Sequence, residues 1–170
     1  MQKNGEISMI HYRKATIQDL VKIWNRYIAE NPEDSRYLRW KEQFISRNVH
    51  GEVSTFVIVS DDFPIGEVTL DYHAKGYGNT ASQTILADGK TTAYVTALRI
   101  RKAYEGNGCI SQLMHYMEDY ARNKGFKQLT IGVEASEVRT REIYQHWGYT
   151  NHILSEMDDG ALVLFYAKQL

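Results

Sequence analysis

The segment from residue 92 to residue 133 constrains the fold more than any other part of this chain. Residues 92–101 alternate along a strand pattern, and glycines at 106 and 108 predict a tight turn after it. A strongly amphipathic helix follows the turn, because apolar residues recur at helical spacing: Ile110, Leu113, Met114, Met117 and Ala121. The apolar alternation over 129–133 predicts another strand. A strand, a helix and a second strand in this order predict a right-handed parallel crossover.

The rest of the chain surrounds this crossover with further strands and helices. Thr16, followed by Asp19, is typical of a residue that caps the start of a helix. The cluster of glycines and small polar residues over 74–91 predicts a long hairpin loop. The other predicted elements are strands at 10–14, 53–59 and 65–72, helices at 17–28, 35–48 and 137–147, and a hairpin of strands at 149–156 and 162–168. This order predicts a mixed sheet flanked by helices.

Length and composition favour an ordinary globular protein. A chain of 170 residues is the usual size of one domain, so we expect a polar N-terminal extension at residues 1–8 and a single domain over residues 9–170. Twenty basic and 21 acidic residues argue against nucleic-acid binding through phosphates. The longest apolar run, 161–167, is too short to span a bilayer, and the N-terminus lacks the apolar region of a signal peptide. The single cysteine, Cys109, excludes an internal disulfide and fits a cytoplasmic location.

The turn with Gly106 and Gly108 is the strongest local indication of a binding site. Glycines allow backbone N–H groups to point outward at the start of a helix, where they have no partner within the helix. Together with the helix dipole, these donors suit an anion of the size of a diphosphate. The alternative is a tight turn that needs glycines for its conformation alone. The spacing by itself leaves both interpretations open.

The residues around this turn resemble the GNAT family of N-acetyltransferases. Leu98-Arg99-Ile100, followed by Tyr104-Glu105-Gly106-Asn107-Gly108-Cys109-Ile110, resembles that family's signature of a strand, a glycine turn and a helix. The opening segment 10–20, the segment 133–149 and the closing segment 159–170 are similar to other parts of the family. The resemblance implies an α/β GNAT acyltransferase fold, with a mixed, largely antiparallel sheet of six to seven strands flanked by about four helices.

The resemblance also implies an acetyl-CoA-dependent N-acetyltransferase with acetyl-CoA as co-substrate and no metal. Tyr144 matches the tyrosine that protonates the departing thiolate in many members of the family. The expected reaction is direct acetyl transfer to a primary amine. The cofactor-binding residues that the resemblance implies are Leu98, Arg99, Ile100, Glu105, Gly106, Asn107, Gly108, Cys109, Ile110 and Ser111.

Several residues depart from the pattern of the family. Glu105 stands where the family usually has arginine or glutamine, and Ile110 replaces a small residue. Lys102 is the nearest cation that could compensate for Glu105. The resemblance carries over no general base, and Glu134 is a candidate that equally suits a solvated carboxylate. By its spacing alone, Tyr144 also fits a core aromatic residue, and Cys109 fits a small core residue.

The acceptor and some alternatives stay open at this point. We expect a small-molecule amine, because the stretch 24–40 combines aromatic rings with Glu30, Glu33 and Asp34. The same acids also suit a solvated turn between helices. Other hypotheses are an idle acyl-CoA-binding module, an acetyltransferase of protein or peptide amines, and a dinucleotide site at 76–81 that lacks its usual βαβ context. We expect no nucleic acid, membrane or metal partner, and the sequence leaves a homodimer open.

Overall fold

The computed structural model describes residues 9–170; the extension expected at residues 1–8 lies outside them. The contacts divide the described chain into two units, residues 9–68 with 98–116, and residues 69–97 with 117–170. The elements in chain order are β1 (Ile10–Lys14), α1 (Ile17–Glu30), α2 (Arg36–Val49), β2 (Val53–Ser60), β3 (Phe63–Asp71), α3 (Thr80–Leu86), β4 (Thr92–Ile100), a 3-10 turn η1 (Lys102–Tyr104), α4 (Cys109–Asn123), β5 (Gln128–Glu134), α5 (Val138–His146), β6 (Asn151–Asp158) and β7 (Ala161–Gln169).

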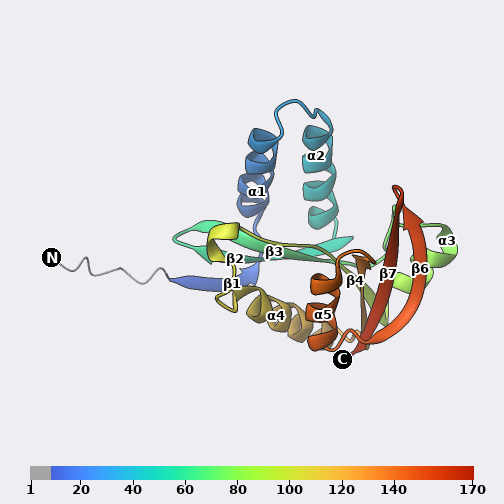
Figure 1. The fold of residues 1–170 in the computed structure, drawn as a ribbon. Helices are drawn as coiled ribbons and strands as arrows, with labels where there is room; N and C mark the ends of the chain where they lie inside the picture. The colour runs from blue at the N-terminus through green and yellow to red at the C-terminus, as the bar shows by residue number, and fades with distance from the viewer. Residues whose placement is uncertain (1–8) are drawn as a thin grey trace. The chain divides into compact units, whose positions relative to one another are not determined.

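The seven strands hydrogen-bond in the order β1-β2-β3-β4-β5-β7-β6 (Figure 1). β1 pairs antiparallel with β2, and β7 pairs antiparallel with both β5 and β6. β4 and β5 run parallel, which confirms the relation predicted for the strands at 92–101 and 129–133. The mixed, largely antiparallel sheet of six to seven strands is therefore confirmed. Residues 9–170 contain five α-helices, where about four were expected.

A capping box fixes the start of α1 in the first unit. The backbone N–H of Asp19 donates to the Thr16 hydroxyl at 3.2 Å, and the Thr16 N–H donates to the Asp19 carboxylate at 2.8 Å. Arg13 of β1 donates to the same buried carboxylate. Burial opposes ionisation of Asp19, but the hydrogen bonds from Arg13 and Thr16 hold its pKa below the usual value. The predicted cap is confirmed, and it also ties α1 to β1.

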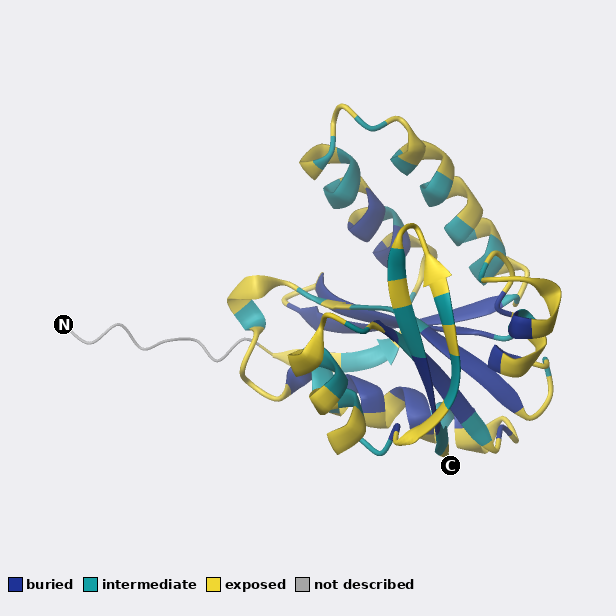
Figure 2. Ribbon diagram, turned by 45° about the vertical axis from the view of Figure 1, so that its right-hand side comes forward, coloured by how far each residue is buried: buried dark blue, intermediate teal, exposed yellow. Residues whose placement is uncertain are grey.

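α1 and α2 lie side by side as an antiparallel pair (Figure 1). The ring of Trp24 on α1 lies 5.6 Å from that of Tyr27 and 5.5 Å from that of Phe44 on α2. Ile23 packs against Val57 on β2, so the apolar side of α1 covers this part of the sheet. Figure 2 shows that buried residues occur on α1 but not on α2.

β2 and β3 form the most buried part of the sheet. Every residue of β2, and every residue of β3 after Phe63, is buried. The sequence alternation placed Glu67, Thr69 and Asp71 on one face of β3, and that face is covered as well as the other. Three polar side chains are therefore withdrawn from solvent on this strand. Such groups need polar partners, because burying a carboxylate without one is costly.

The second unit ends in the predicted β6–β7 hairpin. Asp159 and Gly160 both have positive φ, 46° and 80°, and they connect the paired residues Asp158 and Ala161. Two central residues with positive φ are typical of a type I′ turn, which matches the twist of an antiparallel hairpin. The hairpin around Asp158-Asp159-Gly160 is confirmed.

The long loop expected over 74–91 is wrong in one respect, because residues 80–86 form α3. The Asn79 side chain accepts from the N–H of Ser82 at 3.0 Å and caps this short helix. Leu86 is fully buried, and Ser82 donates to Glu156 of β6. Contacts with residues distant in the sequence thus stabilise a helix whose local composition resembles a loop. None of the helices within residues 9–170 combines the length and apolarity needed to cross a bilayer.

Candidate active site

The glycine turn lies between η1 and the start of α4, in the first unit. Gly106 and Gly108 have φ of 80° and 75°, a region that side chains rarely adopt. A Cβ added at either glycine would meet no atom within 4 Å. Open space therefore faces both glycines at the N-terminus of a 15-residue helix. The first N–H groups of such a helix have no partner within it and can bind an anion.

The residues of the turn divide into an exposed part and a buried part. Glu105, Gly106, Asn107 and Gly108 are exposed, whereas Cys109 is buried. Burial, followed by a contact with the Cys109 thiol, raises the pKa of Tyr12 on β1 to about 12. Cys109 therefore anchors the start of α4 in the core, as the sequence predicted. Ile110 and Ser111 follow in the first turn of α4 and are half-buried.

The end of β4 carries the other residues expected to bind the cofactor. Leu98 and Ile100 are half-buried, and Arg99 between them is exposed. Pairing of β4 with β5 is recorded from Thr92 to Val95, and Ala97 then has a positive φ of 52°. A left-handed conformation at a non-glycine residue is uncommon and marks a local irregularity of the strand. The roles of these residues as cofactor ligands remain predictions.

The two expected catalytic residues lie in the second unit. Tyr144 is half-buried on α5, and its ring stacks on that of Trp147 at 5.8 Å. Burial, with a smaller contribution from the charge of Glu137, raises the pKa of Tyr144 to about 12. The phenol is therefore fully protonated at neutral pH. Glu134 is exposed at the end of β5, opposite Val163 of β7.

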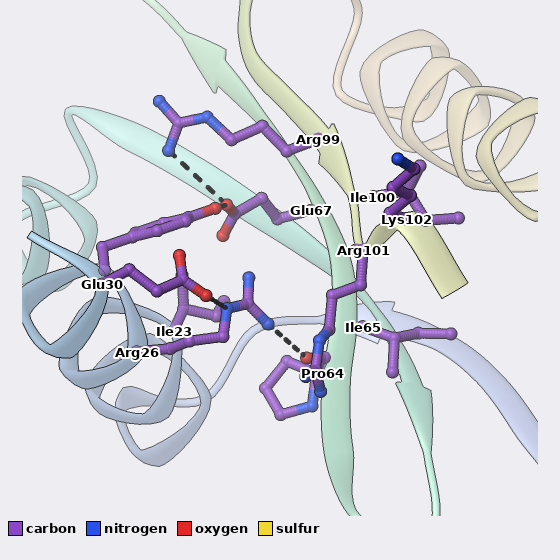
Figure 3. Close-up of a pocket in the computed structure, with 12 residues that line it drawn as sticks. Ile23, Arg26, Glu30, Pro64, Ile65, Glu67, Arg99, Ile100, Arg101 and Lys102 are labelled. Carbon is purple, nitrogen blue, oxygen red and sulfur yellow. Dashed lines mark hydrogen bonds and ion pairs between the residues drawn. The ribbon is translucent and has the colours of Figure 1, made fainter. Parts of the chain in front are cut away.

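A cavity of about 370 Å³ lies within the first unit, between α1, the start of β3 and the end of β4 (Figure 3). Four cationic side chains and two carboxylates belong to its lining. The cations are Arg26, Arg99, Arg101 and Lys102, and the acids are Glu30 and Glu67. The four cations leave a formal excess of two positive charges even when both acids are ionised. This volume suits a small ligand.

The innermost charged group of this cavity is Glu67, which is only 5% exposed. The Tyr27 hydroxyl donates to its carboxylate, and Arg99 Nη1 lies 3.8 Å from Glu67 Oε1. Burial raises the pKa of Glu67, although Tyr27, Arg99 and Arg26 oppose that shift. The Arg99 guanidinium also lies 4.9 Å from the centre of the Tyr27 ring. A buried carboxylate with a raised pKa is a better proton acceptor near neutral pH than a solvated one.

The sequence interpretation missed this cluster. No local signal marked Glu67, because it alternates with apolar residues as Thr69 and Asp71 do, which is typical of a strand with one solvated face. Of the three acids in the 24–40 stretch, only Glu30 lines the cavity. Asp34 instead forms an ion pair with Arg36 at 2.7 Å, which lowers the pKa of Asp34. Asp34 thus fits the solvated turn between helices that the sequence left open, and the use of this stretch to bind an amine remains a prediction.

Two other expectations concern dinucleotide and metal sites. A helix does follow the Gly76-Tyr77-Gly78 segment, contrary to the sequence interpretation, but α3 has only seven residues. Tyr77 packs on Tyr94 with ring centres 4.8 Å apart, so this segment contributes to the core of the second unit. Among residues 9–170, no group of three or more His, Cys, Asp or Glu side chains is arranged to hold a metal ion.

Comparisons with known proteins show which family this chain belongs to. A model described as the Acetyltransferase (GNAT) family matches residues 17–149. A Streptococcus pyogenes serotype M1 protein named as an uncharacterized acetyltransferase is 28% identical over 115 residues, covering 66% of this chain and 79% of its own.

Solved structures of GNAT proteins share the fold. An N-acetyltransferase from Staphylococcus aureus Mu50 has a TM-score of 0.69 at 17% identity, over 95% of this chain and 99% of its own. A GNAT family acetyltransferase from Elizabethkingia anophelis with acetyl-CoA bound has a TM-score of 0.59 at 14% identity, over 95% and 98% of the two chains.

These findings confirm the resemblance that the glycine turn and its flanking segments indicated. The family match includes α1, the β4–turn–α4 segment and Tyr144, but it does not extend to residues 10–16 or to the closing segment 159–170. The expected class of enzyme, an acetyl-CoA-dependent N-acetyltransferase, follows from the family. The chain belongs to the Acetyltransferase (GNAT) family.

Proposed function

We propose that this enzyme transfers the acetyl group of acetyl-CoA to the primary amine of a small molecule by direct attack of the amine on the thioester. The observation that carries the proposal is the pair of left-handed glycines, Gly106 and Gly108, with open space above the start of α4. Backbone N–H groups in such a turn suit the diphosphate of the cofactor.

Substitution of Gly108 by alanine tests this assignment. We expect acetyl-CoA to bind at least tenfold more weakly, because a Cβ occupies the space above the turn and the backbone prefers to leave its left-handed conformation. Gly51→Ala is the matched control, since Gly51 lies in the same unit, has φ of 71° and also has open space around it. Calorimetry measures both affinities. Equal losses for the two variants would show that the effect is conformational, and the cofactor would then bind elsewhere.

We propose Tyr144 as the general acid that donates to the departing thiolate. Its raised pKa supports this role, because the phenol keeps its proton until negative charge develops on sulfur. Tyr144→Phe should lower kcat by about 100-fold and leave acetyl-CoA affinity nearly unchanged. Tyr116→Phe, on the exposed side of α4, is the control. A Tyr144→Phe variant with normal kcat would make Tyr144 a packing residue only.

The proton of the attacking amine needs an acceptor, and two carboxylates are candidates. Glu134, expected from the sequence, is exposed and stays a candidate. Glu67 is supported better, because it is buried in the cavity and its pKa is raised. The Glu134→Gln and Glu67→Gln variants separate these two. The group that serves as base should, on removal, eliminate the acidic limb of the pH profile of kcat.

Mass spectrometry after incubation with acetyl-CoA and a panel of amines tests the reaction as a whole. Acetylation of free small amines supports the proposal, whereas modification of peptide amines alone moves the acceptor to proteins. Binding of acetyl-CoA without transfer to any acceptor supports an idle binding module.

We further propose that residues 9–170 unfold as one domain, which a single calorimetric transition would support. A cytoplasmic location, suggested by the single Cys109, is also a proposal, and cell fractionation tests it. A homodimer is a further proposal, which light scattering tests.

A further inference from the structure

The charges in the cavity of the first unit are not balanced within the protein. The Glu67 carboxylate accepts a hydrogen bond from Tyr27 and forms an ion pair with Arg99, so it already has its partners. Within residues 9–170, neither Arg101 nor Lys102 has a carboxylate partner, although both line the cavity. Both cations are therefore available to a ligand.

Arg26 adds a third cation with weak partners of its own. Its Nη1 donates to the Pro64 carbonyl at 3.5 Å, and its Nε lies 3.8 Å from Glu30 Oε1 (Figure 3). The Arg26 side chain is only 24% exposed, so its charge is partly withdrawn from water. A partly buried guanidinium with long contacts gains most from a short bidentate interaction with a carboxylate or phosphate.

The backbone holds this end of the cavity in place. The N–H of Arg101 donates to the Ile65 carbonyl at 2.8 Å, which joins the residue after β4 to β3. Gly66, the next residue of β3, also lines the cavity. Arg26 therefore extends from a capped helix, and Arg101 from a backbone position that is hydrogen-bonded to β3. Charged groups on rigid elements select ligands better than groups on a loop.

We propose that this cavity binds an anionic group of the acceptor, so that the substrate is an amine that also carries a carboxylate or a phosphate. The inference rests on the proposed function and narrows its acceptor class. Arg26, Arg101 and Lys102 hold the acid group, and the amine remains free to attack the thioester. An amino acid or an amino-alkyl phosphate has this chemistry, whereas a polyamine does not.

Matched pairs of acceptors test the substrate class. The pairs are L-amino acids against their α-amides, and O-phosphoethanolamine against ethanolamine. We expect the acid member of at least one pair to have a kcat/KM at least tenfold above that of its neutral member. Arg101→Gln/Lys102→Gln should abolish this preference mainly through KM, whereas Arg39→Gln, an exposed cation on α2, should retain it. Neutral amines that equal or exceed their acid partners throughout the panel overturn the proposal.

The phosphates of the cofactor could also supply the anion that binds these cations. A second experiment therefore distinguishes the cofactor from the acceptor as the source of the anion. Affinities for coenzyme A and 3′-dephospho-coenzyme A are compared in the wild type and the double variant. We expect both affinities to be unchanged by the double substitution. A loss confined to coenzyme A would assign the cavity to the cofactor's 3′-phosphate and overturn the acceptor proposal.

A third experiment measures anion binding to the cavity without any acetyl transfer. Titration with inorganic phosphate is followed by NMR at the backbone N–H groups of residues 99–102. We expect saturable shifts in the wild type that disappear in the double variant and persist in Arg39→Gln. If no amine is acetylated while phosphate still saturates this site, the proposed function fails and the anion site stands. Absence of both the acid preference and saturable phosphate binding overturns the inference itself.

Discussion

Substitution of Gly66 by alanine should destabilise the protein, although alanine is normally the better strand residue. A Cβ built on Gly66 would lie 2.7 Å from Ile58 Cδ1 and 3.1 Å from the carbonyl oxygen of Arg99. Ile58 is fully buried on β2, so its side chain has no solvent into which it can turn. The Arg99 oxygen belongs to the backbone of β4 and cannot yield without moving that strand.

The magnitude follows from these two contacts. Overpacking of a tight core by a carbon atom costs about 1–3 kcal/mol. Without a clash, replacing glycine by alanine stabilises by about 0.4–1 kcal/mol through the unfolded chain. We therefore expect a net loss of about 1 kcal/mol, or about 2–4 °C in Tm for a chain of this size. If the clash dominates, Gly66→Ala lowers the free energy of unfolding; if the entropy of the unfolded chain dominates, the substitution raises it. The sign of the measured change therefore decides between the two.

A double-mutant cycle identifies the responsible contact. Ile58→Val removes Cδ1 and should cost about 1 kcal/mol by itself. In the double variant, the space left by Cδ1 accepts the new Cβ, so the losses should be less than additive by about 1 kcal/mol. Urea denaturation of the four proteins gives the coupling. A Gly66→Ala variant more stable than the wild type would refute the reasoning, and strict additivity would assign the loss to the Arg99 carbonyl instead.

Two further predictions concern α1 and Glu67. Thr16→Ala should lower the free energy of unfolding by about 1 kcal/mol, because it removes the acceptor for the Asp19 N–H, whereas Thr16→Ser should keep most of it; thermal melts compare the three proteins. Because the pKa of Glu67 is raised, the folded state binds its proton more tightly than the unfolded state does. The stability that this proton contributes is fully present below the unfolded pKa, about 4.3, and is lost as the pH rises through the folded pKa. In urea titrations, the stability of the wild type relative to Glu67→Gln should therefore fall as the pH rises above about 4.3, and an increase with pH would contradict the assignment.

Local signals in the sequence were sufficient for most of the elements. Thr16 and Asp19 predicted the start of α1, because the capping box involves residues only three positions apart. The glycine turn and the amphipathic spacing of α4 predicted the parallel connection to β5 for the same reason. Each of these features depends on side chains that are neighbours along the chain.

Features that depend on distant residues could not be predicted in this way. α3 has a cap at Asn79, but its burial requires contacts such as that of Ser82 with Glu156, 74 residues later. The Tyr27–Glu67 contact joins residues 40 positions apart, and nothing near Glu67 in the sequence indicates a buried carboxylate with a phenol above it. Asp34, in the turn before α2, pairs with Arg36, which fits the solvated turn that the sequence left open.

The two anion sites that we propose along the segment from Arg99 to Gly108 use different kinds of donor. Around Gly106 and Gly108 the donors are backbone N–H groups, whose partial charges persist whatever side chains surround them. At Arg101 and Lys102 the donors are full charges on side chains, which a substitution can remove without altering the path of the chain. Neutralising these cations should therefore leave a cofactor site at the turn intact while changing the choice of acceptor. Within one enzyme family, such a division allows acceptor specificity to change without loss of the shared donor.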